Sequence, residues 1–184
     1  MNSNEDIIRY IRKQFFAYRN GIVADTLRKN GDPHHLIMGC QMTDVATIAR
    51  TISPDKHLAE ALWADSKHRE CRMIAPMLYP VADMDKTTAL RWAGDVECEE
   101  IADILCHRLL RKLPFASEIA DELFHTESPF ANYTRLRLLL NLIMMNKVVK
   151  TPQLKARLLS DLQSATSKTR TIITSILEEF NEPK

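Results

Sequence analysis

Glycine and long apolar runs are both scarce in this sequence. Only 4 of the 184 residues are glycine, about 2% against a usual share of roughly 7%, and sheet-rich folds need glycine at turns and bulges. The shortage predicts a helical protein. No apolar run approaches the roughly 20 residues of a membrane-spanning helix, and residues 1–6 are polar and acidic rather than basic and then apolar. We therefore expect neither a membrane span nor a secretory leader.

Paired cysteines and nucleotide-binding motifs are also missing. Cys40, Cys71, Cys98 and Cys106 form no C-x-x-C pair, which is typical of reduced thiols in a cytoplasmic protein rather than of a disulfide framework. Gly-rich phosphate loops, dinucleotide fingerprints and the Ser-His-Asp order are absent. Nucleotide hydrolysis and acyl transfer are set aside on that ground, and we expect no cofactor.

Charge is balanced overall but uneven along the chain. The net charge is +1, composed of −3 over residues 1–107 and +4 over residues 108–184. A net charge of +1 neither indicates nor excludes a nucleic-acid partner. The basic second part is consistent either with a DNA-binding surface or with an ordinary solvated face.

Helical periodicity is what the sequence does contain. Apolar spacing over residues 4–18 predicts an amphipathic helix that ends at Asn20-Gly21. Residues 30–33 predict a turn, and Thr43 is expected to cap a helix that ends at Ile52. Ser53-Pro54 is then expected to open the first of several two-helix units, which begin near residues 55, 83, 114 and 152.

These units predict stacked helical hairpins of the HEAT or armadillo type, shorter than the usual roughly 40 to 47 residues. We expect an all-α helical-repeat solenoid in one domain over residues 1–184, with capping helices over 1–35 and stacked hairpins over 36–184. An irregular all-α bundle is the alternative. The second helix of each hairpin usually lines the inner face of such a stack. Those helices carry Arg69, Arg72, Glu99, Glu100, Asp103, Arg135, Arg137, Lys168 and Arg170.

Several segments together resemble the DNA alkylation repair, or AlkD-like, HEAT-repeat family of glycosylases that act on alkylated purines. The resemblance runs from about residue 20 to the end and thins after Leu113. It rests on Gly39–Val45, Ile48–Ala49, Leu58–Trp63, His68–Arg72, Ala75, Met77–Leu78, Trp92 and Ile101–Cys106. Family members are usually somewhat longer, so the chain looks like a shortened version.

The resemblance implies a concave cleft that binds duplex DNA, in which a carboxylate and two tryptophans face a positively charged damaged nucleotide. Such a carboxylate stabilises the cationic lesion and the oxocarbenium that forms as the glycosidic bond breaks. Indole faces add cation–π attraction of about 0.5 to 2 kcal/mol. The family is thought to act with the lesion still in the base stack.

Asp103 falls where the family has its catalytic carboxylate. Glu99, one helical turn earlier, falls where the family has an aromatic residue. Two carboxylates at i and i+4 repel, which tends to raise one pKa, so Glu99 and Asp103 are expected to share a proton. These two residues are the catalytic candidates.

The DNA-binding candidates follow from the same comparison. Tyr133, Arg135 and Arg137 lie near the family's phosphate-binding Trp-x-Arg-Arg segment, with the charges displaced by one residue, or about 100° around a helix. Ser175 falls where a second cleft tryptophan is expected. Arg69, Arg72, Lys168 and Arg170 complete the set, although Arg69, Glu70 and Arg72 also fit an ion-pair network between neighbouring repeats.

Two classes of function therefore remain open. The first is a divergent glycosylase, which needs another aromatic such as Tyr133 or Trp92 to reach the cleft. The second is a catalytically inactive helical repeat that grips DNA or a protein partner along the same surface. The sequence specifies no oligomeric state.

The remaining candidates favour structural roles. His34-His35 has no further ligand at helical spacing, so it is expected to be solvated rather than to bind metal. Cys106 is expected in the core and Cys98 at a helix start, which disfavours zinc or nucleophile chemistry. Trp63 and Trp92 lie on apolar stripes and are expected to be core residues.

Overall fold

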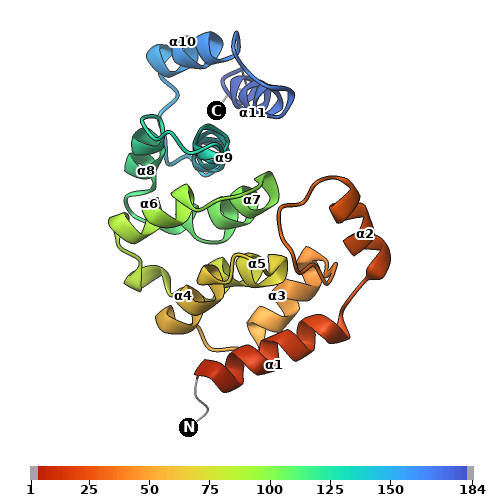
Figure 1. Ribbon diagram of the computed structural model, residues 1–184. Coiled ribbons are helices and arrows are strands. Elements are labelled where there is room, and N and C mark those ends of the chain that lie inside the picture. Colours follow the sequence, from red (N-terminus) through yellow and green to blue (C-terminus); the bar gives the residue numbers. More distant parts are fainter. Residues whose placement is uncertain (1–3, 182–184) are drawn as a thin grey trace. The chain divides into compact units, whose positions relative to one another are not determined.

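The computed structural model describes residues 4–181, and the regular elements of this range are helices (Figure 1). The all-α prediction is confirmed. The α-helices are α1 Asn4–Ala17, α2 Gly21–Lys29, α3 Met42–Arg50, α4 Lys56–Ala64, α5 Arg69–Leu78, α6 Lys86–Gly94, α7 Glu99–Arg108, α8 Ala116–Leu123, α9 Ala131–Met144, α10 Pro152–Asp161 and α11 Ser167–Glu179. None of these helices is long and apolar enough to cross a membrane.

The chain divides into two compact units. The N-terminal unit spans residues 1–84 and holds α1 to α5, and the C-terminal unit spans residues 85–184 and holds α6 to α11. The expected single domain over 1–184 stays a prediction, and residues 1–3 and 182–184 of that range lie outside the described residues.

The N-terminal unit is built around the α4–α5 hairpin. Helix α3 packs on α5, and α1 packs on α3 and α4. The core receives Ile11 and Phe15 from α1 and Trp63 from α4, all at most 1% exposed. Burying a side chain of this size contributes roughly 1.5 to 3 kcal/mol. The predicted core role of Trp63 is confirmed.

In the C-terminal unit, the second helices of successive hairpins pack side by side. Helix α6 packs on α8, while α7, α9 and α11 form a row in which α9 contacts both of the others. The core between α9, α10 and α11 is formed by Leu136, Leu139, Leu140, Ile143, Leu158, Ile172, Ile173 and Ile176. Stacked hairpins require this row of second helices, and the row gathers the candidate site residues.

Three expected helix boundaries differ in the structure, two of them because an Asn or Asp side chain caps the helix at another position. Asn20 does not end a helix but begins α2, where its Oδ1 accepts hydrogen bonds from the N–H groups of Ile22 and Val23. Asp55, rather than Ser53, caps α4 and accepts from Leu58 N at 2.7 Å. Gln41, rather than Thr43, is the N-cap of α3. Asn and Asp are strong N-caps, so the signal was present but misassigned.

Candidate functional site

Asp103 is the centre of a polar cluster in the C-terminal unit. Arg137 on α9 donates from Nε to Asp103 Oδ1 at 2.6 Å and from Nη2 to Oδ2 at 3.2 Å. Tyr133, also on α9, donates its hydroxyl to Asp103 Oδ1 at 3.1 Å. The arginine fork thus binds both carboxylate oxygens, which is the strong bidentate geometry.

Tyr133 and Arg137 reach the same carboxylate because they are one turn apart on α9. Arg137 Nη2 donates to the Tyr133 hydroxyl at 3.2 Å, and the guanidinium carbon lies 5.8 Å from the ring centroid. The Asp103 side chain remains 41% exposed and that of Arg137 29%. Asp103 and Tyr133 together therefore hold a planar cation at a place that solvent reaches.

Glu99 lies one turn before Asp103 on α7 and has its own cation. Lys168 on α11 donates from Nζ to Glu99 Oε1 at 2.6 Å. No hydrogen bond joins the Glu99 and Asp103 carboxylates among the described residues. The proton-sharing pair expected from the sequence is replaced by two separate ion pairs, because the row of second helices supplies one cation for each carboxylate.

The pKa values of the two carboxylates are shifted in opposite directions. Burial raises the pKa of Asp103, and Arg137 and Tyr133 only partly offset it, while Glu99 adds a small further increase. Burial also opposes ionised Glu99, but the hydrogen bonds from Lys168 and from the backbone outweigh it and lower the pKa of Glu99. The balance between burial and the bound cation thus differs for the two carboxylates on this helix.

The two remaining basic candidates of the C-terminal unit, Arg135 and Arg170, differ in how far they are exposed to solvent. Arg170 on α11 is exposed and donates to the Ala165 carbonyl oxygen at 3.4 Å. Arg135, by contrast, is 4% exposed and donates to Asp161 at 2.7 Å and to Asn132 at 2.9 Å. Its guanidinium is already bound inside the protein, so the phosphate contact expected of Arg135 requires these bonds to break.

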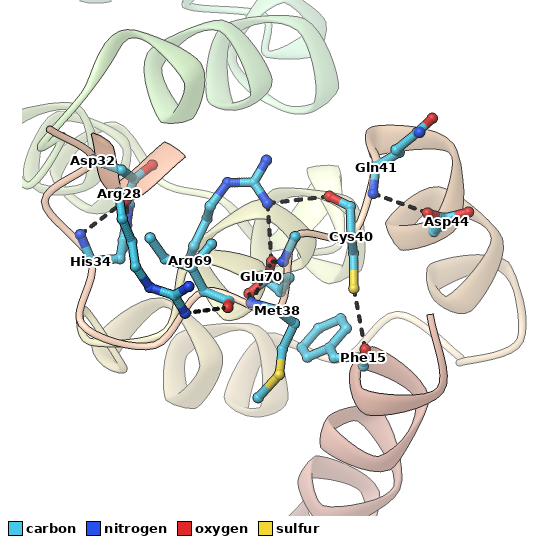
Figure 2. A network of polar contacts seen from close by, with 12 residues as sticks. Phe15, Arg28, Asp32, His34, Met38, Cys40, Gln41, Asp44, Arg69 and Glu70 are labelled. Atoms are coloured by element: carbon cyan, nitrogen blue, oxygen red, sulfur yellow. Dashed lines mark hydrogen bonds and ion pairs between the residues drawn. The ribbon is translucent and has the colours of Figure 1, made fainter. Parts of the chain in front are cut away.

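Arg69 and Arg72 lie in the N-terminal unit and are 3% and 5% exposed. Figure 2 shows Arg69 donating to the Cys40 carbonyl oxygen at 3.1 Å and to Glu70 at 2.9 Å. The Arg72 guanidinium carbon lies 4.3 Å from the ring centroid of Trp63. The alternative of an internal ion-pair network describes Arg69 better than the expected surface contact does, because its carboxylate partner is fully buried.

Of the two aromatic candidates, Tyr133 contacts Asp103 and Trp92 lies in the core. Trp92 is fully buried, as its core prediction required, and therefore does not reach the Asp103 cluster as an exposed face. Ser175 lies on α11 and is half-buried. Tyr133 is the aromatic that contacts Asp103. The sequence identified Tyr133 but missed its hydroxyl bond to the carboxylate, for which the spacing of Tyr133 and Arg137 was the available signal.

The histidines and one further side-chain cluster carry atoms that could bind a metal. His34 is buried and its Nδ1 lies 2.7 Å from Asp32 Oδ1, so the expectation that it is solvated is wrong, while His35 is exposed. A donor set not anticipated from the sequence is Asp65, His68 and Cys71, whose ligand atoms lie within 4.8 Å of one another.

That donor set is poorly suited to a cation. Arg12 already donates to Asp65 Oδ2 at 2.8 Å, and burial raises the pKa of the Cys71 thiol to about 12. A metal ion requires the thiolate and would have to displace the arginine. The geometry is that of a satisfied hydrogen-bond cluster.

Comparisons with known proteins identify a family and a related fold. The family described as DNA alkylation repair enzyme matches residues 11–168. A solved structure with TM-score 0.76 and 14% identity covers 93% of this chain and 74% of its own, and is described as a new family of proteins related to the HEAT-like repeat DNA glycosylases with affinity for branched DNA structures. No curated protein matches. The likeness in structure confirms the predicted HEAT-like fold class.

Proposed function

We propose that this chain, which belongs to the DNA alkylation repair enzyme family, binds duplex DNA and releases alkylated purines from it at Asp103. The observation that carries the proposal is the cation held between Asp103 and Tyr133. Arg137 presents a planar, delocalised positive charge to the carboxylate at 2.6 Å and lies 5.8 Å from the aromatic ring centroid. An alkylated purine is also a planar, delocalised cation, and it would take the place of the guanidinium.

The chemistry is the hydrolysis of an N-glycosidic bond. The bond between C1′ and the base nitrogen breaks with its electron pair passing to the base, so the base leaves neutral and C1′ becomes an oxocarbenium. Water then adds to C1′ and releases a proton to solvent. Ionised Asp103 stabilises the positive charge at both stages, and the ring of Tyr133 adds cation–π attraction.

Exposed basic residues near this cluster supply the phosphate contacts in the proposal. Lys168 is 63% exposed in its side chain, and Arg170 is exposed. Arg137 is released towards phosphate when the lesion replaces it at Asp103. The DNA contacts expected of Arg69, Arg72 and Arg135 stay predictions. They require these buried side chains to leave their internal contacts.

Release of free methylated purine from a methylated duplex tests the enzyme. We expect release above spontaneous depurination, and Asp103→Asn should lower the rate by about 100-fold or more. Tyr133→Phe keeps the ring and removes the hydroxyl, so its loss should be much smaller. Asp121→Asn, an exposed acid on α8, is the matched control. No release by the unaltered protein, or equal rates for Asp103→Asn and Asp121→Asn, rejects the catalytic proposal.

A catalytically inactive DNA-binding module is the second candidate. It is favoured by the pairing of both carboxylates with cations and by the burial of Trp92. The affinity of the structural relative for branched DNA makes a four-way junction a useful probe beside a linear duplex. Binding that weakens with rising salt, without base release, supports the module. No binding at low salt favours a protein partner.

A further inference from the structure

The face of α1 that carries Arg9, Lys13 and Phe16 has a chemical character unlike the Asp103 cluster. It borders a groove of about 710 Å³ in the N-terminal unit, lined by Glu5, Ile8, Arg9, Arg12, Lys13 and Phe16. Ligand sites commonly occupy roughly 300 to 1,000 Å³. We call this feature the α1 groove.

The lining residues recur every three or four positions, which places them along one face of the helix. An adjoining face buries Ile11 and Phe15 in the core, so α1 is fixed while the groove stays open. Three of the six lining residues are basic and one is acidic. The groove is therefore complementary to an anion.

Two of its basic groups are available to a ligand. Lys13 is exposed. Arg9 pairs with Asp6 at 3.2 Å, but the two side chains are 68% and 49% exposed, and exposed pairs of this kind contribute little. Arg12 differs because it is bound to Asp65 at 2.8 Å. Phosphate groups would thus meet Arg9 and Lys13 first.

The groove ends at an exposed aromatic. Phe16 is 56% exposed, and the guanidinium carbon of Arg19 lies 3.8 Å from its ring centroid. Arg19 also donates to the Phe16 carbonyl oxygen at 3.1 Å, which fixes the stacked arrangement. Unpaired nucleobases stack on aromatic rings and on guanidinium planes, whereas bases in a duplex already have both faces covered.

We propose that the α1 groove binds unpaired nucleotides of single-stranded DNA, with Arg9 and Lys13 on the phosphates and the Phe16–Arg19 stack on the bases. A groove with exposed basic side chains that ends in an exposed aromatic offers both kinds of contact that single-stranded nucleic acid uses. The site uses no residue of the Asp103 cluster. Its test therefore stands apart from that of the repair activity.

The test measures fluorescence anisotropy of a labelled oligo-thymidylate and of an abasic oligonucleotide of equal length. Phe16→Ala should weaken oligo-thymidylate binding by roughly 5-fold or more and leave abasic binding unchanged. Lys13→Gln should lower the slope of log affinity against log salt by about 0.7 for both probes.

Two controls account for surface position and charge. Ile22→Ala removes an apolar side chain that is 82% exposed and lies outside the groove lining, and Lys29→Gln removes an exposed basic one on α2. Both should leave oligo-thymidylate affinity unchanged. The proposal is overturned if the unaltered protein fails to bind oligo-thymidylate at low salt, or if Phe16→Ala binds it equally well.

Discussion

Each unit contains an acid paired with an arginine, and the two pairs differ in what surrounds them. In the N-terminal unit Glu70 is 0% exposed and accepts from Arg69. In the C-terminal unit Asp103 accepts from Arg137, and its side chain is 41% exposed. A carboxylate enclosed by fixed donors serves the fold, whereas one that keeps an open side is available to a ligand.

The donors around Glu70 come largely from the backbone. The N–H of Met38 lies 3.1 Å and 3.2 Å from the two carboxylate oxygens (Figure 2). That of Gly39 lies 2.9 Å from Oε1. The connection between α2 and α3 is thereby bound to α5. Within residues 4–181, Asp103 accepts from side chains alone, and a ligand cation can replace them without breaking backbone hydrogen bonds.

The largest expected effect is the loss of stability in Glu70→Gln. The amide group would face Arg69 and two backbone N–H groups in a site with no access to water. Leaving a buried charge without its partner costs roughly 3 to 5 kcal/mol. The midpoint of urea unfolding should fall while the dependence on urea concentration stays constant.

Asp25→Asn is the matched control for Glu70→Gln. Asp25 pairs with Arg28 at 3.0 Å, but its side chain is 70% exposed. Its effect should be several times smaller. Similar shifts for the two variants would contradict the structural role given to the enclosed pair.

Gly39→Ala should give the next largest loss. Gly39 has a φ of 76°, and a Cβ there would lie 2.2 Å from the Asn20 carbonyl oxygen. Strain and overlap together should cost at least about 2 kcal/mol. Gly94→Ala is the control, because nothing lies within 4 Å of its Cβ position; being helical, it should gain roughly 0.5 to 1 kcal/mol. Equal changes in the midpoint of thermal unfolding for the two variants would contradict this prediction.

The sequence predicted most of the helices because their apolar periodicity is local. It also placed Asp103 and Glu99 on one helix face, since that depends only on spacing. It missed the separate cations, because Lys168 reaches Glu99 across 69 positions of the chain. It also missed the burial of Arg69 and Arg135, since an arginine that extends into a core has the same local pattern as one that extends into solvent.

Asp161→Asn tests whether Arg135 and Asp161 form an enclosed ion pair in the C-terminal unit. Arg135 is 5% exposed in its side chain and Asp161 is 22% exposed. Because Asn132 still accepts from the guanidinium, the loss should be roughly 1 to 2 kcal/mol, smaller than for Glu70→Gln. Urea unfolding measures it. A loss as large as that of Glu70→Gln would remove the contrast between the two units.

The smallest expected effect is a pH dependence of stability that separates the two carboxylates of α7. The raised pKa of Asp103 means that the folded protein binds this proton more readily than the unfolded chain. The contribution of Asp103 to the free energy of unfolding is therefore fully present below its ordinary pKa of 3.8 and is lost as pH rises through the folded pKa. Subtracting the Asp103→Asn curve from that of the unaltered protein should leave a difference that falls as pH rises.

Glu99 should give the opposite sign. Its pKa is lowered from 4.5 because the bonds from Lys168 and the backbone outweigh its burial, so its contribution is present above that pH and is lost as pH falls through the folded value. The same subtraction with Glu99→Gln should leave a difference that rises with pH. Urea unfolding from about pH 2.5 to about pH 7 covers both windows. Slopes of equal sign would mean that the two carboxylates titrate as one coupled pair, and the separate assignment of Arg137 and Lys168 would then fail.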